Sequence, residues 1–268
     1  CLVFRNAADY LREWLLFHLA SGVDHFYLYN NDSTDAFHRV LFPFISRGFV
    51  ELFDWPGMYQ QGAVYMDCLN RVTNRSVRAG TTKAGEWLAF IDDDEFLFDS
   101  EGFQLGEALE KYTENAGVAV PWFLYGTSNQ VHATSEPVIR RFTLRHRNPD
   151  QHHKCIVIPE RIVRPVAGGH LFECRGDFQI VDQGGFPVTE ARSTNRVDGS
   201  IRINHYLTKS CEELIRRRTS RSIDTGLTPK FSLQQWIEFD RNWNDVEDRC
   251  AQRFLGRMAE LSADFPEC

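Results

Sequence analysis

The feature that most constrains this chain is a short apolar run, residues 87–91 (W-L-A-F-I), that passes directly into Asp92, Asp93, Asp94 and Glu95. The apolar residues predict a buried strand, and residues 96–98 return the chain to a core. Carboxylates packed this closely repel one another and are costly to desolvate, so a cation is expected beside them. Oxygen ligands in an Asp-x-Asp pattern suit Mn²⁺ or Mg²⁺ and leave room for a phosphorylated substrate. A solvated acidic turn is the alternative.

Strand-like and helix-like patterns alternate along the first half of the chain. Strands are predicted at 2–4, 24–29, 49–53 and 87–91, and helices at 8–20 and about 60–79. This alternation predicts an α/β fold with a doubly wound, mostly parallel sheet flanked by helices. Such sheets bind ligands at the carboxyl ends of their strands, where the polar segments 5–6, 30–35 and 92–95 lie. The side chains of 30–35, Asp35 among them, are also expected to cap a helix.

The second half of the chain is less regular. Residues 126–199 are rich in Gly, Pro, His and Arg, with short strands such as 154–158, and we interpret them as substrate-facing irregular structure. A strand at 201–206 follows, and two helical segments, about 210–222 and 232–261, close the chain.

Composition excludes several classes of protein. The 268 residues are 43% hydrophobic and 25% charged, which is typical of a soluble globular domain. The net charge of −7 argues against a general nucleic-acid binder, and no run approaches the length of a transmembrane segment. Seven cysteines without a C-x-x-C pair argue against a structural zinc site and, more weakly, against a disulfide scaffold.

The chain begins at Cys1, inside an apolar run, and we interpret it as an excised fragment. Reduced thiols predict a cytoplasmic protein, with any membrane association supplied by regions outside the fragment. A fragment from the Golgi lumen of a eukaryote is the alternative.

Five motifs in order resemble glycosyltransferase family 92, the DUF23 group of family-2-like enzymes. Residues 5–14 (RNAADYLREW) are similar to K-N-E-x-x-Y-L-x-E-W, and residues 22–35 (GVDHFYLYNNDSTD) to G-V-x-H-F-Y-x-Y-D-N-x-S-x-D. Residues 90–96 (FIDDDEF), 122–128 (WFLYGTS) and 204–210 (NHYLTKS) resemble F-x-D-x-D-E-F, W-x-x-F-G-S-S and N-H-Y-x-x-K-S. Arg5, Ala7 and Asn30 stand where the family usually has Lys, Glu and Asp.

The resemblance implies a GT-A fold and an inverting, metal-dependent transfer of a sugar from a UDP-sugar, usually galactose, to a glycan or glycoconjugate acceptor. It divides a single domain, residues 1–268, into a nucleotide-sugar-binding half (1–125), an acceptor-side half (126–206) and C-terminal helices (207–268). The departures at Arg5, Ala7 and Asn30 lie near the expected nucleoside pocket, so the donor is less firmly implied than the reaction.

The acidic run and the resemblance together predict the metal ligands. Asp92 and Asp94 are expected to bind the ion, because alternate residues of an extended chain point to the same side. Asp93 then points away, toward the ribose, and Glu95 toward a helix or toward a residue that supports the metal ligands. The resemblance adds His205 as the third ligand, delivered from a remote strand.

Residues of several loops are expected to bind the donor and the acceptor. Arg5, Asn6, Asn31 and Asp32 should border the nucleoside, because amide and carboxylate groups can pair with the edges of uracil. Lys209 is a candidate phosphate clamp, whereas Arg216, Arg217 and Arg218 are interpreted as a solvated or anion-facing helix surface. An inverting transfer also needs a general base, which the sequence does not identify. The candidates are Glu173, Asp177, Asp182 and His170, and Trp55, Trp122 and Tyr125 either stack on sugars or pack in the core.

Two other functions fit parts of the sequence. A sugar nucleotidyltransferase also uses a doubly wound sheet and metal-binding carboxylates, but it would need a Gly-rich phosphate loop after the first strand, and residues 4–8 (FRNAA) are not Gly-rich. A non-catalytic carbohydrate-binding module would not need Asp92, Asp94 and His205 together.

Overall fold

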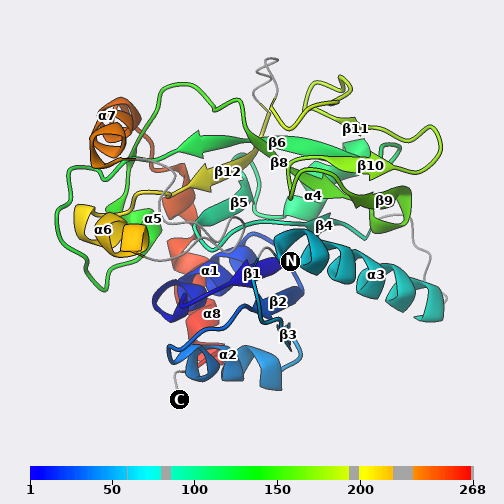
Figure 1. The fold of residues 1–268 in the computed structure, drawn as a ribbon, viewed down its shortest axis with the longest axis horizontal. Helices are drawn as coiled ribbons and strands as arrows, with labels where there is room; N and C mark the ends of the chain where they lie inside the picture. Colours follow the sequence, from blue (N-terminus) through cyan, green and yellow to red (C-terminus); the bar gives the residue numbers. More distant parts are fainter. Residues whose placement is uncertain (59, 80–85, 193–198, 220–231, 267–268) are drawn as a thin grey trace.

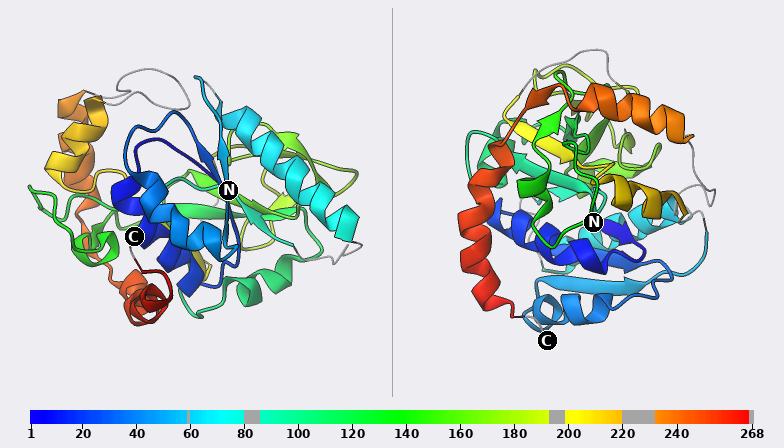
Figure 2. Two further views of the ribbon diagram at one scale, coloured as in Figure 1. Left: turned by 90° about the horizontal axis from the view of Figure 1, so that it is seen from below. Right: turned by 90° about the vertical axis from the view of Figure 1, so that its left-hand side faces the viewer.

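The computed structural model describes residues 1–58, 60–79, 86–192, 199–219 and 232–266 (Figures 1 and 2). Its first sheet has three parallel strands in the order β1 (Leu2–Phe4), β2 (Phe26–Asn30) and β3 (Val50–Asp54). The connections between them are α1 (Ala8–Ala20) and α2 (Phe37–Ser46). The alternating pattern therefore predicted this part of the fold correctly, and the bounds of α1 are those expected.

The second sheet is mixed and has the order β4-β8-β6-β12-β5, with β11 beside β6. Its strands are β4 (Leu88–Ala89), β5 (Glu95–Asp99), β6 (Gly117–Leu124), β8 (His153–Val157), β11 (Ile180–Val181) and β12 (Ile201–His205). Strand β12 runs parallel to β6 and antiparallel to β5, whereas β8 is antiparallel to β6. The predicted α/β fold with parallel strands is confirmed, and among the described residues the antiparallel strand pairs lie in this second sheet and in two short pairs outside it.

The remaining elements surround the two sheets. The helices are α3 (Gln61–Ala79), α4 (Leu105–Leu109), α5 (Val138–Arg141), α6 (Cys211–Thr219), α7 (Leu233–Trp243) and α8 (Leu255–Asp264), with 3₁₀ turns η1 (Glu110–Tyr112), η2 (Pro159–Arg161) and η3 (Cys250–Phe254). Two antiparallel pairs join β9 (Ile162–Pro165) to β10 (Phe172–Cys174) and β7 (Leu144–Arg145) to β13 (Val246–Glu247). In Figure 1 the first sheet lies below the second, with α3 on one side and α6 and α7 on the other.

Two local predictions are wrong, and a third is confirmed. The strand expected at 87–91 is only Leu88–Ala89, because the chain leaves β8 and Ile91 N instead donates to Cys1 O at 3.2 Å. The helix expected at 232–261 ends at Trp243, where the Asn244 side chain donates to Asp240 O at 2.8 Å and so closes the helix. The expected helix cap is present, because Asp35 Oδ2 accepts from Ala8 N at 2.8 Å and so caps α1.

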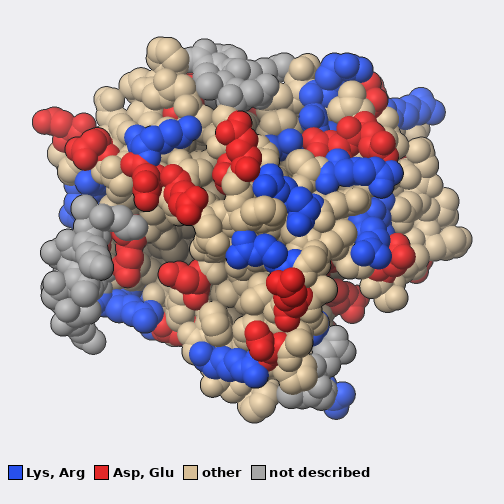
Figure 3. Space-filling view, turned by 180° about the vertical axis from the view of Figure 1, so that it is seen from behind, with Lys and Arg blue, Asp and Glu red and all other residues tan. Residues whose placement is uncertain are grey.

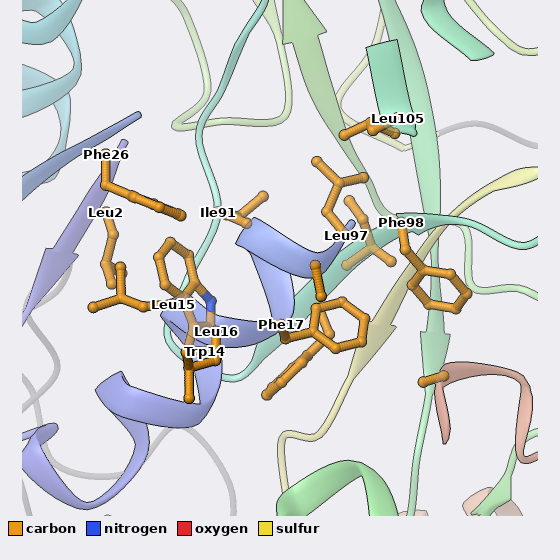
Figure 4. Close-up of a cluster of buried hydrophobic side chains, with 14 of the residues drawn as sticks. Leu2, Trp14, Leu15, Leu16, Phe17, Phe26, Ile91, Leu97, Phe98 and Leu105 are labelled. Atoms are coloured by element: carbon orange, nitrogen blue, oxygen red, sulfur yellow. The ribbon is translucent and has the colours of Figure 1, made fainter. Parts of the chain in front are cut away.

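Helix α1 connects the core to the acidic run. It packs against β5, α2 and α8, and it buries Trp14 and Phe17 among side chains of both sheets (Figure 4). Trp14 Nε1 donates to two backbone carbonyls, Asp92 O and Glu95 O, each at 3.0 Å. The buried indole therefore fixes the backbone of the acidic run from the core side, since a buried indole N–H requires a partner.

The charged side chains of the surface are mixed in sign. Seen from behind, Lys and Arg alternate with Asp and Glu across the molecule (Figure 3). The net charge of −7 is therefore not gathered into one acidic patch on that face. Within the described residues, the helices are all too short or too polar to cross a bilayer.

Candidate active site

The acidic run forms a tight turn rather than an extended strand end. Glu95 N donates to Asp92 O at 3.1 Å and Asp92 N donates to Glu95 Oε2 at 2.8 Å, so the chain reverses across four residues. The extended geometry on which a shared side for Asp92 and Asp94 was predicted is therefore absent from this segment. The two carboxylates instead meet different partners, Asp92 on β8 and Asp94 on β12.

A lysine provides a cation beside the acidic turn. Lys154 of β8 is 2% exposed, and its Nζ lies 3.0 Å from Asp92 Oδ2 and 3.3 Å from Glu95 Oε2. Burial alone would lower the pKa of Lys154, but these two carboxylates outweigh it and raise the pKa well above its ordinary value. Burial raises the pKa of Glu95 to about 7, and Lys154 opposes that rise. The repulsion predicted from the sequence is thus relieved in part by the chain itself.

Asp94 and His205 form a second buried pair at the other end of the turn. His205 stands opposite Glu95 in the β12–β5 register, and Tyr206 N donates to Asp94 O at 2.8 Å. This register places His205 Nε2 3.3 Å from Asp94 Oδ1, with the two side chains 6% and 0% exposed. The structure therefore brings together two of the three residues predicted as metal ligands, although 111 positions separate them (205 − 94).

The donor atoms fit a metal ion in part. A carboxylate oxygen and an imidazole nitrogen of one buried pair are both ligands that Mn²⁺ accepts. Asp92 faces Lys154 instead, and across the described ranges no group of three or more His, Cys, Asp or Glu side chains is arranged to hold a metal. Asp94 and His205 thus offer two protein ligands, and the metal ligands stay a prediction.

Trp122 of β6 lies beside this pair and is bordered by three histidines. Its indole contacts the His205 ring edge-on at 4.5 Å between centroids, stacks on His152 at 5.2 Å and meets His170 at 5.2 Å. The register explains the convergence, because Val120, Trp122 and Leu124 share one face with Lys154 and His205 of the neighbouring strands. Trp122 therefore connects the Asp94–His205 pair to the loop before β8.

The loops expected at the nucleoside lie together at the carboxyl ends of β1 and β2. Arg5 Nε donates to Asn31 O at 2.7 Å, and Thr34 N donates to Asn6 Oδ1 at 2.7 Å. Asn31 is buried, and its amide donates to Trp55 O and Gly57 O, while Asp32 Oδ2 accepts from Gly57 N at 2.9 Å. Asn6 and Asp32 both have a left-handed backbone, with φ of 53° and 55°. These bonds join the loops into one surface, in which Asn31 supports the backbone.

Lys209 and the arginines of α6 lie in different environments. Lys209 is 6% exposed, has a φ of 50° and places its ammonium 4.1 Å from the centre of the Tyr10 ring. Arg216 is exposed and faces Asp9 at 3.8 Å, as expected for a helix surface. Arg217 and Arg218 belong to α6, but their side chains lie outside the described part, and Asp93 is half-buried in the turn.

The other aromatic candidates have structural partners. Trp55 Nε1 donates to Gln60 Oε1 at 3.1 Å, and Tyr125 is buried with its hydroxyl 3.0 Å from Asn204 Nδ2. Tyr125 is therefore a core residue, and of the three aromatic side chains Trp122 is the one in contact with His205.

The four candidates for the general base lie in different places. Glu173 pairs with Arg164 on the exposed β9–β10 hairpin, and Asp177 is exposed on the following loop. Asp182 accepts from Gly184 N and Phe186 N beside β11, which pairs with the start of β6 rather than with its Trp122 end. His170 alone reaches the site, where its ring meets Trp122 and its Nδ1 lies 2.6 Å from His153 O.

Comparison with known proteins decides the family. The sequence pattern of glycosyltransferase family 92 matches residues 1–165 of the 268. The chain belongs to glycosyltransferase family 92. The match includes the acidic turn, Trp122 and Lys154, whereas His205 lies beyond it.

Curated relatives from plants carry the same family name. A family 92 protein of Ricinus communis is 28% identical over 212 residues, which is 77% of this chain and 34% of that protein. A family 92 protein of Oryza sativa subsp. japonica is 28% identical over 211 residues, covering 77% and 32%. The chain thus spans about a third of the length of these relatives. The crystal structure of S. aureus TarS 1-349 aligns over 98% of this chain and 71% of its own, with 10% identity and a TM-score of 0.40.

Sequence reasoning missed the roles of Lys154, of Asp150 with His152, and of Trp14 at this candidate site. Lys154 was assigned only to a short strand, although a lysine that leads a run of apolar residues, C-I-V-I, is a signal for a buried charge. Asp150 and His152 lie just before β8, and none of the five motifs includes them. Trp14 was predicted only as part of the helix at 8–20, whereas its N–H also holds the acidic turn.

Proposed function

We propose that this family 92 domain transfers a sugar from a UDP-sugar to a glycan or glycoconjugate acceptor, with inversion and with Mn²⁺ or Mg²⁺ as cofactor. Galactose is the donor sugar we favour, in keeping with the sequence resemblance. The observation that carries the proposal is the buried Asp94–His205 pair, 3.3 Å apart, at the end of a lysine-neutralised acidic turn. Because the chain spans only about a third of its relatives, the substrates are part of the proposal.

Asp94 and His205 are the residues proposed to hold the metal. When bound, the ion neutralises the charge that develops on the departing diphosphate. The chain contributes the rigidity of the site: Lys154 fixes Asp92 and Glu95 on one side, and the indole of Trp14 fixes the turn backbone on the other. Groups held in place in this way stabilise the transition state more than mobile groups do, because they need not reorient during the reaction.

The joined loops of β1 and β2 are proposed to receive the nucleoside. Arg5 and Asn6 lie at the carboxyl end of β1, and Asp32 at that of β2, which is where parallel sheets bind nucleotides. Arg5 is partly buried and bonded to Asn31, so a base would meet a fixed guanidinium. Lys209, with its ammonium over Tyr10, is proposed to approach the phosphates from the C-terminal side.

A thermal-shift experiment tests the proposal. The melting temperature is measured with UDP, with other nucleoside diphosphates and with UDP-galactose, each with and without Mn²⁺. We expect UDP and UDP-galactose to raise it, and Mn²⁺ to enlarge the rise in the parent but not in Asp94→Asn. Equal shifts with and without metal, or a preference for another base, would contradict the proposal. A preference for nucleoside triphosphates would favour a nucleotidyltransferase.

A further inference from the structure

If the chain transfers a sugar with inversion, as proposed above, it needs a group that accepts the proton of the acceptor hydroxyl. We propose that His152, oriented by Asp150, is this general base. The pair lies in the loop before β8, on the other side of Trp122 from Asp94 and His205.

The backbone holds both residues against Trp122. Asp150 N donates to Trp122 O at 2.7 Å, and Trp122 N donates to His152 O at 3.1 Å. Asp150 Oδ1 then lies 2.9 Å from His152 N and 2.5 Å from His152 Nδ1. A carboxylate bonded to Nδ1 fixes the ring and stabilises the imidazolium that forms when the other nitrogen takes a proton.

The hydrogen bonds of His152 define the tautomer that a base requires. Arg192 Nε donates to His152 Nε2 at 2.8 Å, so Nε2 carries a lone pair and the ring proton lies on Nδ1, toward Asp150. Arg192 is an exposed residue. An acceptor hydroxyl that takes the place of its N–H would donate to the same lone pair.

The His152–Asp150 pair is more exposed than the His205–Asp94 pair, as expected if the first meets an acceptor from solvent and the second meets the donor. His152 and Asp150 side chains are 32% and 28% exposed, whereas His205 and Asp94 are 6% and 0% exposed. Trp122 stacks on His152 and contacts His205 with its edge, so the indole separates an open pair from an enclosed one. In an inverting displacement the base and the leaving group lie on opposite sides of the reacting carbon, so we assign the open pair to the acceptor and the enclosed pair to the departing diphosphate.

His170 is the competing histidine of the site. Its Nδ1 meets a carbonyl oxygen, His153 O, instead of a carboxylate, so its ring lacks the directly bonded negative charge that Asp150 gives His152. Burial and, next, the Lys154 ammonium lower the pKa of His170 to about 4. His170 is therefore a weaker proton acceptor than a histidine bonded to Asp150.

The step balances without another reactant. The acceptor hydroxyl gives its proton to His152 Nε2 while its oxygen forms a bond to C1 of the donor sugar. The bond from C1 to the diphosphate oxygen breaks, and its electron pair leaves with UDP. His152 then carries one positive charge opposite the Asp150 carboxylate, and it returns the proton to solvent.

The test compares two nucleophiles that need no knowledge of the natural acceptor. UDP release from UDP-galactose is measured with water as the nucleophile and with added azide, which is already an anion and needs no base. We expect His152→Ala to lower the reaction with water by about 10²-fold or more while the azide reaction stays near that of the parent. Asp150→Asn, which changes a single atom of the orienting carboxylate, should show the same selectivity to a smaller degree.

His25→Ala is the matched control, because His25 Nε2 also bonds a carboxylate, Glu51 Oε1 at 3.0 Å, but on the first sheet. It should leave both reactions unchanged. If the water and azide reactions fall together in His152→Ala and in Asp150→Asn, the pair has a structural role and the inference is wrong. If neither falls while Asp94→Asn is inactive, the inference is wrong and the proposed function stands. A parent that releases no UDP with either nucleophile overturns both.

Discussion

The two ends of the acidic turn have different surroundings, although their sequence positions look equivalent. At one end Asp92 is 32% exposed and bonded to a buried ammonium, that of Lys154. At the other end Asp94 is fully buried and faces an imidazole, that of His205. A carboxylate that is already paired with a lysine ammonium gains less from a metal than one that faces an imidazole, which can itself bind the ion. From this comparison we expect Asp92 to support the turn and Asp94 to be the carboxylate available to the proposed metal.

The largest expected effect is on the activity of Asp94→Asn. The change keeps the shape of the side chain but removes the charge proposed to hold the metal, so sugar transfer or donor hydrolysis should fall by a factor on the order of 10² or more. Asp92→Asn is the matched variant at the other end, and its activity should fall by about tenfold or less, because a single hydrogen-bonded contact is lost. Equal losses in the two variants would remove the distinction between the two ends.

A second expected effect is on the stability of Lys154→Met. The change leaves Glu95 and Asp92 without their cation, and breaking a buried ion pair from one side costs on the order of 3 kcal/mol of unfolding free energy. Urea unfolding without metal measures this cost, and Lys111→Met, an exposed lysine, is the control. Added Mn²⁺ should restore part of the loss, since the freed carboxylates can bind it. A variant as stable as the parent would show that the turn does not depend on Lys154.

The smallest expected effect concerns a buried ion pair away from the turn, Arg141 with Glu213. Burial would raise the pKa of Glu213, but bonds from Arg141, Ser210 and Tyr10 outweigh it and lower the pKa to about 2. Because this pKa lies below that of an unfolded glutamate, the stability it provides is present above about pH 4.3 and is lost as the pH falls toward 2. The difference in unfolding free energy between the parent and Glu213→Gln, measured by urea unfolding, should therefore become smaller between pH 5 and pH 3. A free-energy difference that stays constant with pH would show that other groups, such as those of the acidic turn, cause any loss of stability in acid.

The sequence predicted the elements whose signals are local. Helix α1 has the expected bounds because Leu11, Trp14 and Leu15 repeat at helical spacing, and β1 to β3 follow from apolar runs between polar loops. The end of α7 at Trp243 was missed, since its cause is a bond from the Asn244 side chain that periodicity does not report. The different partners of Asp92 and Asp94 were also missed. Alternate residues point to the same side only in an extended chain, and this segment is a turn.

The partners of the turn come from distant parts of the sequence. Lys154 reaches it through the β4–β8–β6 order, and His205 through the β12–β5 register. Neither strand order nor register can be read from a single sequence, and the family resemblance predicted His205 only because a motif surrounds it. Asp150 and His152 have no such motif, so the structure was needed to place them beside Trp122.

The most direct test of the central claim, that Asp94 and His205 act on one metal ion, is a double-mutant cycle in UDP binding. Calorimetry with and without Mn²⁺ gives the metal-dependent gain in affinity for the parent, Asp94→Asn, His205→Ala, the double variant and Asp92→Asn. If the two residues hold the same ion, each single change abolishes most of the gain and the double change loses little more, whereas Asp92→Asn keeps it. A gain that survives in Asp94→Asn and His205→Ala but is lost in Asp92→Asn would contradict the account.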